Sequence, residues 1–143
     1  MKGNLESAIN AIHPMPEDVM EQFLNAWHLT SCPKKTVLSE INSVDKYLYF
    51  ITRGVQKAYY LNDGKEYIVA FNYPYNFSCA PDSFITQTPS NFYAFVGLKG
   101  SKRVSFYSIS AKQVRPVFGR LYLKKRCFDN LVCGIFDFVI LGR

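Results

Sequence analysis

The sequence predicts a mainly β domain of the α+β class: an antiparallel β structure with one helix before it and a long helix after it. Three observations support this fold class. Apolar residues recur at helical spacing near the N-terminus, short runs rich in β-branched and aromatic residues fill the middle, and helical spacing returns near the C-terminus. A length of 143 residues with 48% hydrophobic residues is typical of one globular domain with a sizeable core.

The N-terminal helix is expected from Pro16 to Leu29. Pro16, Glu17 and Asp18 form a favourable first turn, because proline suits the first helical position and acidic side chains suit the positive end of the helix dipole. Apolar side chains then recur every three or four residues, at Val19, Met20, Phe23, Leu24 and Trp27.

Short runs of β-branched and aromatic residues follow and predict successive strands. The turn residues between them agree with this interpretation: Gly54 separates two runs, and Asp63-Gly64 supplies the positive φ angles of a tight hairpin. A last pair of strands is expected to be joined by Lys99–Lys102. About six to eight antiparallel strands would close as a sandwich, barrel or roll. The expected strands are Thr36–Glu40, Tyr47–Arg53, Val55–Leu61, Tyr67–Phe71, Phe92–Leu98 and Arg103–Ile109.

The strand pattern lapses in an insert from Asn76 to Asn91. Pro81–Ile85 could form a single helical turn there, capped by an Asp or Ser side chain. Irregular inserts in a regular β domain are usual places for ligand contacts, so we expect a binding site at this insert.

Helical spacing returns after Ser110, which is a suitable N-cap for a short helix through Val114. Pro116 suits the start of a second, longer helix. Its apolar residues fall on two interleaved seven-residue series interrupted by Lys124, a pattern that fits either packing on the chain's own domain or pairing with a second copy. The series comprises Val117, Leu121, Phe128, Leu131, Ile135 and Phe138.

The order of these elements resembles the effector domain of the Crp/Fnr family of transcription regulators. The supporting motifs cover roughly residues 15–130, and their order is more specific than any one of them. They are Tyr49-Phe50-Ile51-x-x-Gly54, Tyr59-Tyr60-x-x-Asp63-Gly64-Lys65-Glu66, Asp82-Ser83-Phe84-Ile85-Thr86-x-x-Pro89-Ser90, and Ser108-Ile109-Ser110 with Pro116.

The resemblance implies an antiparallel β-roll, or double-stranded β-helix, of the kind that binds cyclic nucleotides. Residues 1–112 would form the roll and its N-terminal helix, and residues 113–143 a dimerisation helix and an apolar tail. It also implies a non-catalytic sensory domain that binds a small effector and forms a homodimer. The expected dimerisation residues are Val117, Leu121, Lys124, Phe128 and Leu131.

Members of the family that bind cyclic nucleotides carry a Gly-Glu pair and an Arg-Ser/Thr pair in the insert. The matching positions here are Cys79-Ala80 and Ser90-Asn91, so both charged groups are missing. Because an arginine that pairs with a buried phosphate contributes strongly to affinity, we expect an effector other than cyclic AMP, or none. The candidate ligand contacts are Ser78, Ala80, Asp82, Ser83, Ser90 and Asn91.

The family continues beyond the long helix into a helix-turn-helix that binds DNA. This sequence ends at Arg143, and its last segment, Cys133–Arg143, is apolar and does not resemble the start of such a domain. We therefore expect a truncated or frame-interrupted regulator without the DNA-binding domain. A degenerate regulator that binds no ligand is an alternative.

The net charge of +6 is unevenly distributed. Residues 1–72 carry seven Lys or Arg against eight Asp or Glu, whereas residues 73–143 carry ten against three. This excess fits a solvated face, an anionic ligand or nucleic acid. A basic cluster in the long helix would support only salt-dependent DNA binding without sequence selectivity, since no recognition helix is visible. The cluster comprises Arg115, Arg120, Lys124, Lys125 and Arg126.

Enzymatic functions lack the residues that they need. A cupin-like, metal-dependent enzyme is the main alternative with this fold class, but His13 and His28 are the only histidines and they form no His-x-His pair. A serine or cysteine nucleophile would have no histidine on a strand to act as its base. We therefore expect no catalytic residue, no metal site and no cofactor apart from a small effector.

Cysteine usage and the N-terminus predict a cytoplasmic protein. The four cysteines form no C-x-x-C pair and are expected to be free thiols, with Cys79 a small buried residue. No apolar run near the N-terminus could serve as a signal peptide, and Leu131–Leu141 is too short to cross a bilayer.

Overall fold

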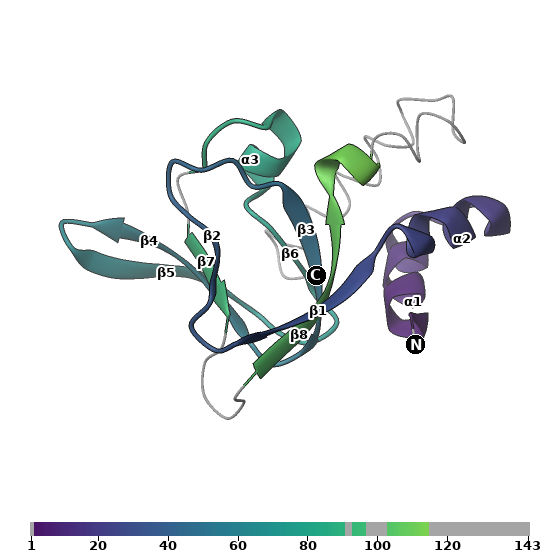
Figure 1. Ribbon diagram of the computed structural model, residues 1–143, viewed down its shortest axis with the longest axis horizontal. Helices are drawn as coiled ribbons and strands as arrows, with labels where there is room; N and C mark the ends of the chain where they lie inside the picture. Colours follow the sequence, from purple (N-terminus) through teal and green to yellow (C-terminus); the bar gives the residue numbers. More distant parts are fainter. Residues whose placement is uncertain (1, 91–92, 97–102, 115–143) are drawn as a thin grey trace.

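The computed structural model describes residues 2–90, 93–96 and 103–114 (Figure 1). The N-terminal helices lie at one end of the molecule, and the hairpin of β4 and β5 projects at the other. In chain order the elements are α1 (Gly3–Ile12), α2 (Glu17–Asn25), β1 (His28–Pro33), β2 (Val37–Ser39), β3 (Tyr47–Arg53), β4 (Gln56–Asn62), β5 (Lys65–Asn72), β6 (Phe77–Ser78), α3 (Pro81–Thr86), β7 (Tyr93–Val96) and β8 (Arg103–Ser110).

The strands form two antiparallel four-stranded sheets, as the sequence predicted for a mainly β roll. One sheet has the order β1-β8-β3-β6, and the other has the order β2-β7-β4-β5. Sequence neighbours β3 and β4 therefore lie in different sheets, and the chain passes between them at Gly54. The expected long C-terminal helix and its dimerisation residues lie outside the described residues.

Alternate residues of β3 serve two different cores, because successive side chains of a strand point to opposite faces. Leu48 and Phe50 belong to a large cluster with the two N-terminal helices, which we call the helix-side core. Tyr49 and Ile51 belong to the inter-sheet core, with Val104, Phe106 and the half-buried Cys32 and Leu38. Strand β3 is thus buried on both faces.

The N-terminal region differs from the sequence prediction in two ways. The structure contains an additional helix, α1, whose Leu5 and Ile9 are fully buried in the helix-side core. The helix expected from Pro16 to Leu29 ends at Asn25, and His28–Pro33 forms β1 instead. Six residues of β1 pair with β8, and this long-range pairing overrides the local helical spacing.

The predicted hairpin turn is confirmed. Asp63 and Gly64 adopt φ angles of 51° and 73°, the left-handed values that the Asp-Gly pair predicted. Across the hairpin, the rings of Tyr60 and Tyr67 stack with centroids 5.1 Å apart. Strand β5 forms the edge of its sheet and leaves much of Tyr67, Ile68, Val69 and Phe71 exposed.

The predicted pairing of the last two strands is wrong. Strand β7 pairs with β2 and β4, whereas β8 pairs with β1 and β3 in the other sheet. Adjacency in sequence suggested a hairpin, but each strand pairs with two other strands of its own sheet. The chain therefore changes sheets between β7 and β8.

The short helix after β8 begins as the sequence predicted, with residues 111–114 helical. The Ser110 hydroxyl accepts a hydrogen bond from the Gln113 backbone N–H at 3.2 Å. The Gln113 side-chain oxygen in turn accepts from the Ser110 backbone N–H at 3.1 Å. This reciprocal pair is a capping box.

Replacing Gly54 with alanine should destabilise the fold strongly. Gly54 has a φ of +89°, and an added Cβ would lie 2.6 Å from the Val104 Cγ2 atom in the inter-sheet core. We expect Gly54→Ala to lower the free energy of unfolding by about 2–4 kcal/mol, measured by urea denaturation. The matched control is Gly64→Ala, where φ is +73° but nothing lies within 4 Å of the new Cβ. A loss at Gly64 as large as that at Gly54 would contradict this account.

Removing the capping box should have a smaller effect. Ser110→Ala deletes the acceptor for the Gln113 N–H and is expected to cost about 1 kcal/mol in the same measurement. Ser110→Asp retains an oxygen acceptor for the Gln113 N–H and should therefore keep most of the wild-type free energy of unfolding. Equal losses in the alanine and aspartate variants would show that the cap contributes little.

Candidate functional site

The predicted helical turn in the insert is present as α3, but its capping differs from the prediction. The N-cap residue is Ala80, and no side chain of the helix caps it. The Asp45 carboxylate, from the loop before β3, takes this role: its Oδ2 accepts a hydrogen bond from the Ala80 backbone N–H at 2.6 Å. A residue 35 positions earlier in the chain therefore holds the start of α3.

Asp45 makes two further contacts with the same segment. Its backbone N–H donates to the Ser83 hydroxyl oxygen at 2.7 Å, and its backbone carbonyl accepts from the Gln87 side-chain amide at 3.1 Å. Asp45 is only 3% exposed. Because the carboxylate is buried, its hydrogen bonds are needed to compensate for lost hydration, and they fix α3 against the loop.

The other end of the insert is held by the same loop. The Ser90 backbone N–H donates to the Ser43 carbonyl, and the Ser90 carbonyl accepts from the Asn42 N–H, both at 2.8 Å. Val44 forms an isolated antiparallel bridge with Pro89. The loop of residues 42–45, which we call the anchor loop, thus contacts both the start and the end of the segment Ala80–Ser90.

Ser78 lies in a separate polar cluster between the two sheets. Its hydroxyl accepts from the Asn72 side-chain amide at 2.9 Å and donates to the Gln56 side-chain oxygen. Gln56 and Asn72 are opposite one another on β4 and β5, and all three side chains are buried. Polar side chains of both sheets therefore meet in the interior of the roll.

The predicted contact residues are only partly brought together. Ala80, Ser83 and Ser90 are buried and are joined through the anchor loop, whereas Ser78 bonds with Gln56 and Asn72. Asp82 lies in α3, but its side chain is not among those described, and Asn91 is outside the described residues. The sequence analysis did not single out Asp45, Gln56 or Asn72. A lone aspartate just before the apolar strand Tyr47–Arg53 was the available signal for Asp45.

The charge of Asp45 reaches the inter-sheet core. Burial, and next the nearby Asp45 carboxylate, raise the pKa of the Tyr49 phenol well above its usual range. Burial also raises the pKa of the Cys32 thiol, which lies beside the same core. The surroundings of α3 thus combine a buried acidic group with neutral hydroxyls and amides. Cys79, which follows Ser78, is half-buried and packs against the helix-side core.

The described part of the chain holds neither a metal-binding cluster nor a membrane-spanning helix. No three His, Cys, Asp or Glu side chains there lie close enough together to hold a metal ion. No helix among the same residues has the length and apolar character needed to cross a membrane.

Comparison with known proteins identifies the fold. No family model matches the chain, and no curated protein sequence matches it. Solved structures do match. A cyclic nucleotide-binding domain from Methylobacillus flagellatus superposes with a TM-score of 0.75 at 11% identity, covering 97% of this chain and 75% of that one.

Two further solved structures show the same similarity. The sensor domain of the regulator DNR from Pseudomonas aeruginosa matches with a TM-score of 0.70 at 17% identity, covering 94% of this chain and 85% of that one. The Thermus thermophilus catabolite activator protein matches with a TM-score of 0.70 at 11% identity, over 90% of this chain and 56% of that one. The chain spans about half the length of several structures that it matches. The fold is therefore that of a cyclic-nucleotide-binding domain, shared at low sequence identity with sensor domains of Crp/Fnr-type regulators.

Proposed function

We propose that this chain is the non-catalytic sensory domain of a Crp/Fnr-like transcription regulator, located in the cytoplasm. It binds a small effector in the β-roll and dimerises through its C-terminal helix, within residues 113–143. The fold and the polar insert support this proposal. The buried Asp45 carboxylate beside α3 limits which effector the domain binds.

The observation that carries the proposal is the attachment of α3 by hydrogen bonds to one buried residue, Asp45. The Asp45 carboxylate accepts a hydrogen bond from the Ala80 backbone N–H, and the Asp45 backbone N–H donates one to the Ser83 hydroxyl oxygen. Hydrogen bonds exchange at low net cost, because a lost partner can be replaced by an equivalent group. An effector that offers such groups can take over these contacts and change the position of α3 relative to the anchor loop.

The same arrangement argues against a phosphate-bearing effector. A cyclic phosphate beside Ala80 and Ser83 would face the buried Asp45 carboxylate, and like charges at short range in a protein interior repel strongly. Ser90-Asn91 stands where cyclic-nucleotide binders carry their arginine, so this segment supplies no compensating cation. The proposed effector therefore lacks a phosphate.

A second candidate function is a regulator that has lost its effector. It is favoured by the fact that Asp45 already satisfies the polar groups that a ligand would bind. A thermal-shift screen separates the two. The proposed sensor should gain stability with an uncharged nucleoside or another phosphate-free metabolite and not with cyclic AMP or cyclic GMP. Stabilisation by none of them would favour the regulator without an effector.

Neutralising Asp45 should improve the binding of cyclic AMP. Asp45→Asn retains an oxygen that accepts from the Ala80 N–H but removes the negative charge. We expect the affinity for cyclic AMP, measured by calorimetry, to rise about tenfold or more over the wild type. The matched control, Asp63→Asn in the hairpin turn, should leave the affinity unchanged.

Asp45→Asn, together with Asp45→Ala, also tests the structural role of Asp45. Asp45→Ala leaves a buried N–H without its acceptor and should lower the free energy of unfolding by about 2–3 kcal/mol, against about 1 kcal/mol for Asp45→Asn. For the binding prediction, tight binding of cyclic AMP by the wild type would contradict the proposal that the effector lacks a phosphate.

Dimerisation is tested by light scattering on the wild type and Leu121→Asp. The wild type should have twice the mass of the chain, and the variant should have the mass of a monomer, because a buried aspartate in an apolar helix seam is strongly unfavourable. Lys112→Asp, before the apolar series, is the control and should remain dimeric. An identical mass for the wild type and Leu121→Asp would remove the helix-seam hypothesis.

A further inference from the structure

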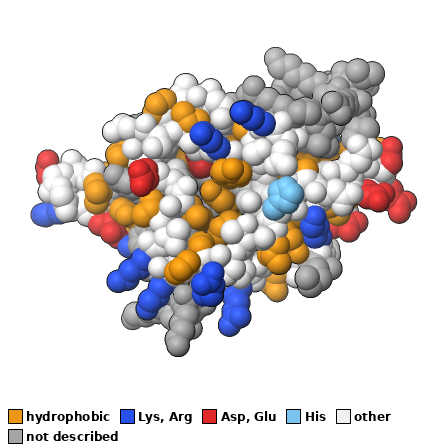
Figure 2. Space-filling view, in the orientation of Figure 1, with side chains coloured by type: hydrophobic (Ala, Val, Ile, Leu, Met, Phe, Trp, Pro, Cys, Tyr) orange, Lys and Arg blue, Asp and Glu red, His pale blue; other side chains and the backbone are white. Residues whose placement is uncertain are grey.

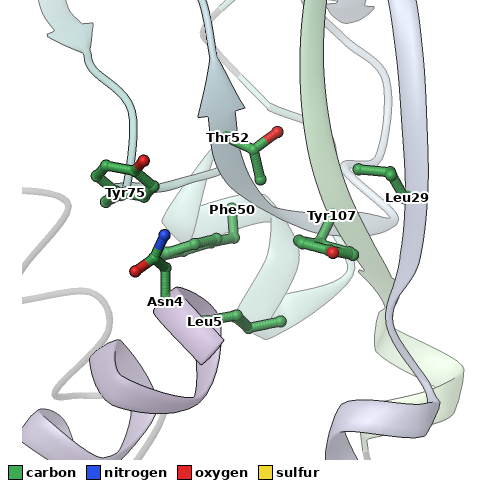
Figure 3. A pocket seen from close by; sticks show the side chains of 7 residues that line it. All are labelled: Asn4, Leu5, Leu29, Phe50, Thr52, Tyr75 and Tyr107. Atoms are coloured by element: carbon green, nitrogen blue, oxygen red, sulfur yellow. The ribbon is translucent and has the colours of Figure 1, made fainter. Parts of the chain in front are cut away.

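A pocket of about 220 Å³ lies between α1 and the sheet that contains β1, β8 and β3 (Figure 3). It is on the helix side of this sheet and shares no residue with the insert Ala80–Ser90. Figure 3 shows the lining side chains arranged around one space, with α1 below and β3 above it. They are Asn4, Leu5, Leu29, Phe50, Thr52, Tyr75 and Tyr107.

The pocket has a buried floor and an open, apolar rim. Leu5 and Phe50 are fully buried, and Tyr107 is nearly so. Leu29 and Tyr75 at the rim remain 55% and 53% exposed. Large apolar side chains that border a hollow and stay in contact with water favour occupation by an apolar ligand, because the ligand removes their surface from water.

The backbone fixes Tyr75 as an aromatic wall of the pocket. Tyr75 has a φ of +69°, a left-handed conformation that few residues other than glycine and asparagine adopt. Backbone hydrogen bonds hold it there: the Tyr75 N–H donates to the Ile51 carbonyl at 2.6 Å, and the Ile51 N–H donates to the Asn76 carbonyl at 3.0 Å. The Tyr75 ring lies 6.5 Å from that of Phe50, at an interplanar angle of 41°.

The lining selects an uncharged ligand. Among the described residues, no Lys, Arg, Asp or Glu lines the pocket, and the polar groups of the lining are the Asn4 amide, the Thr52 hydroxyl and the two tyrosine phenols. The ammonium of Lys2 lies 5.9 Å from the centre of the Tyr107 ring, but it donates to the carbonyls of Leu24 and Trp27. The described lining itself therefore offers a charged ligand no ionic partner.

The volume limits the size of the ligand. An apolar cavity of about 150 Å³ is sufficient for benzene, and pockets for drug-sized molecules begin at about 300 Å³. A pocket of about 220 Å³ fits a molecule of one or two fused rings. Aromatic rings at the floor and wall favour a planar ligand that packs against them.

We propose that this pocket binds a small, uncharged aromatic molecule of one or two fused rings, which packs against Phe50 and Tyr75. A polar group of the ligand hydrogen-bonds to Asn4 or Thr52 at the rim. The ligand bridges α1 and the sheet, so its binding strengthens the attachment of α1. This site is distinct from the proposed effector site in the roll and does not depend on it.

The test uses indole as the probe and the full chain labelled in its leucine methyl groups. In an NMR titration, indole should shift the methyl signals of Leu5 and Leu29 in a saturable manner. The signals of Leu38, beside the inter-sheet core, and Leu61, in the β4–β5 hairpin, should not move. Indole-3-acetate, which carries a negative charge on the same rings, should bind at least about tenfold more weakly.

Two tyrosine variants form a matched pair. Tyr75→Ala removes the aromatic wall and should weaken indole binding by about tenfold or more. Tyr73→Ala removes an equally exposed tyrosine, 55% exposed, that does not line the pocket, and should leave the affinity unchanged. If Tyr75→Ala fails to fold, Asn4→Phe at the exposed surface of α1 replaces it and should abolish binding by filling the pocket.

The proposal is overturned if saturating indole leaves Leu5 and Leu29 unshifted, or if it shifts Leu38 instead. It is also overturned if Tyr73→Ala weakens binding as much as Tyr75→Ala does. Retention of full affinity by Asn4→Phe would exclude this pocket as the site.

Discussion

The contact between the Asp45 carboxylate and the Ala80 N–H determines how the irregular part of this domain is arranged. With the Ser83 and Gln87 contacts of the same residue, it fixes α3 to the anchor loop. The anchor loop in turn holds Ser90 and leads directly into β3, a central strand of its sheet. Loss of the Asp45 carboxylate would therefore release the start of the insert at Ala80. Its end would stay attached through the backbone hydrogen bonds of Ser90 with Asn42 and Ser43. The regular sheets, whose strands pair independently, would keep their partners.

Strand β3 connects the two places where we propose that ligands bind. Tyr49 faces the inter-sheet core, where the nearby Asp45 carboxylate helps to raise its pKa. Its neighbour Phe50 faces the helices and forms part of the floor of the pocket beside α1. The two faces of one strand cannot move separately, because its pleat fixes their relative positions. The two places are therefore held at a fixed position relative to each other by β3.

Local signals predicted the parts of the fold that depend on local chemistry. The bounds of β3, the Asp63-Gly64 turn, α3 and the Ser110 cap follow from strand propensity, positive φ angles and capping. The sequence could not show that His28–Pro33 leaves the helix to pair with β8, or that Asp45 reaches Ala80, because both contacts join distant segments. Ala80 and Ser83 were predicted as site residues from the insert itself. Asp45, which holds both residues in place, lies outside this insert.

The exposed outer edge of β5 has a consequence for the behaviour of the protein at high concentration. An edge strand presents backbone N–H and C=O groups that can pair with a strand of another molecule. The exposed β-branched side chains of Ile68 and Val69 add apolar surface that favours such pairing. The charged residues Lys65 and Glu66 lie only at its start, and Glu66 is already paired with Lys57. The rest of β5 carries no charge against such association. The outer edge of β5 is therefore the place where aggregation at high concentration is expected to begin.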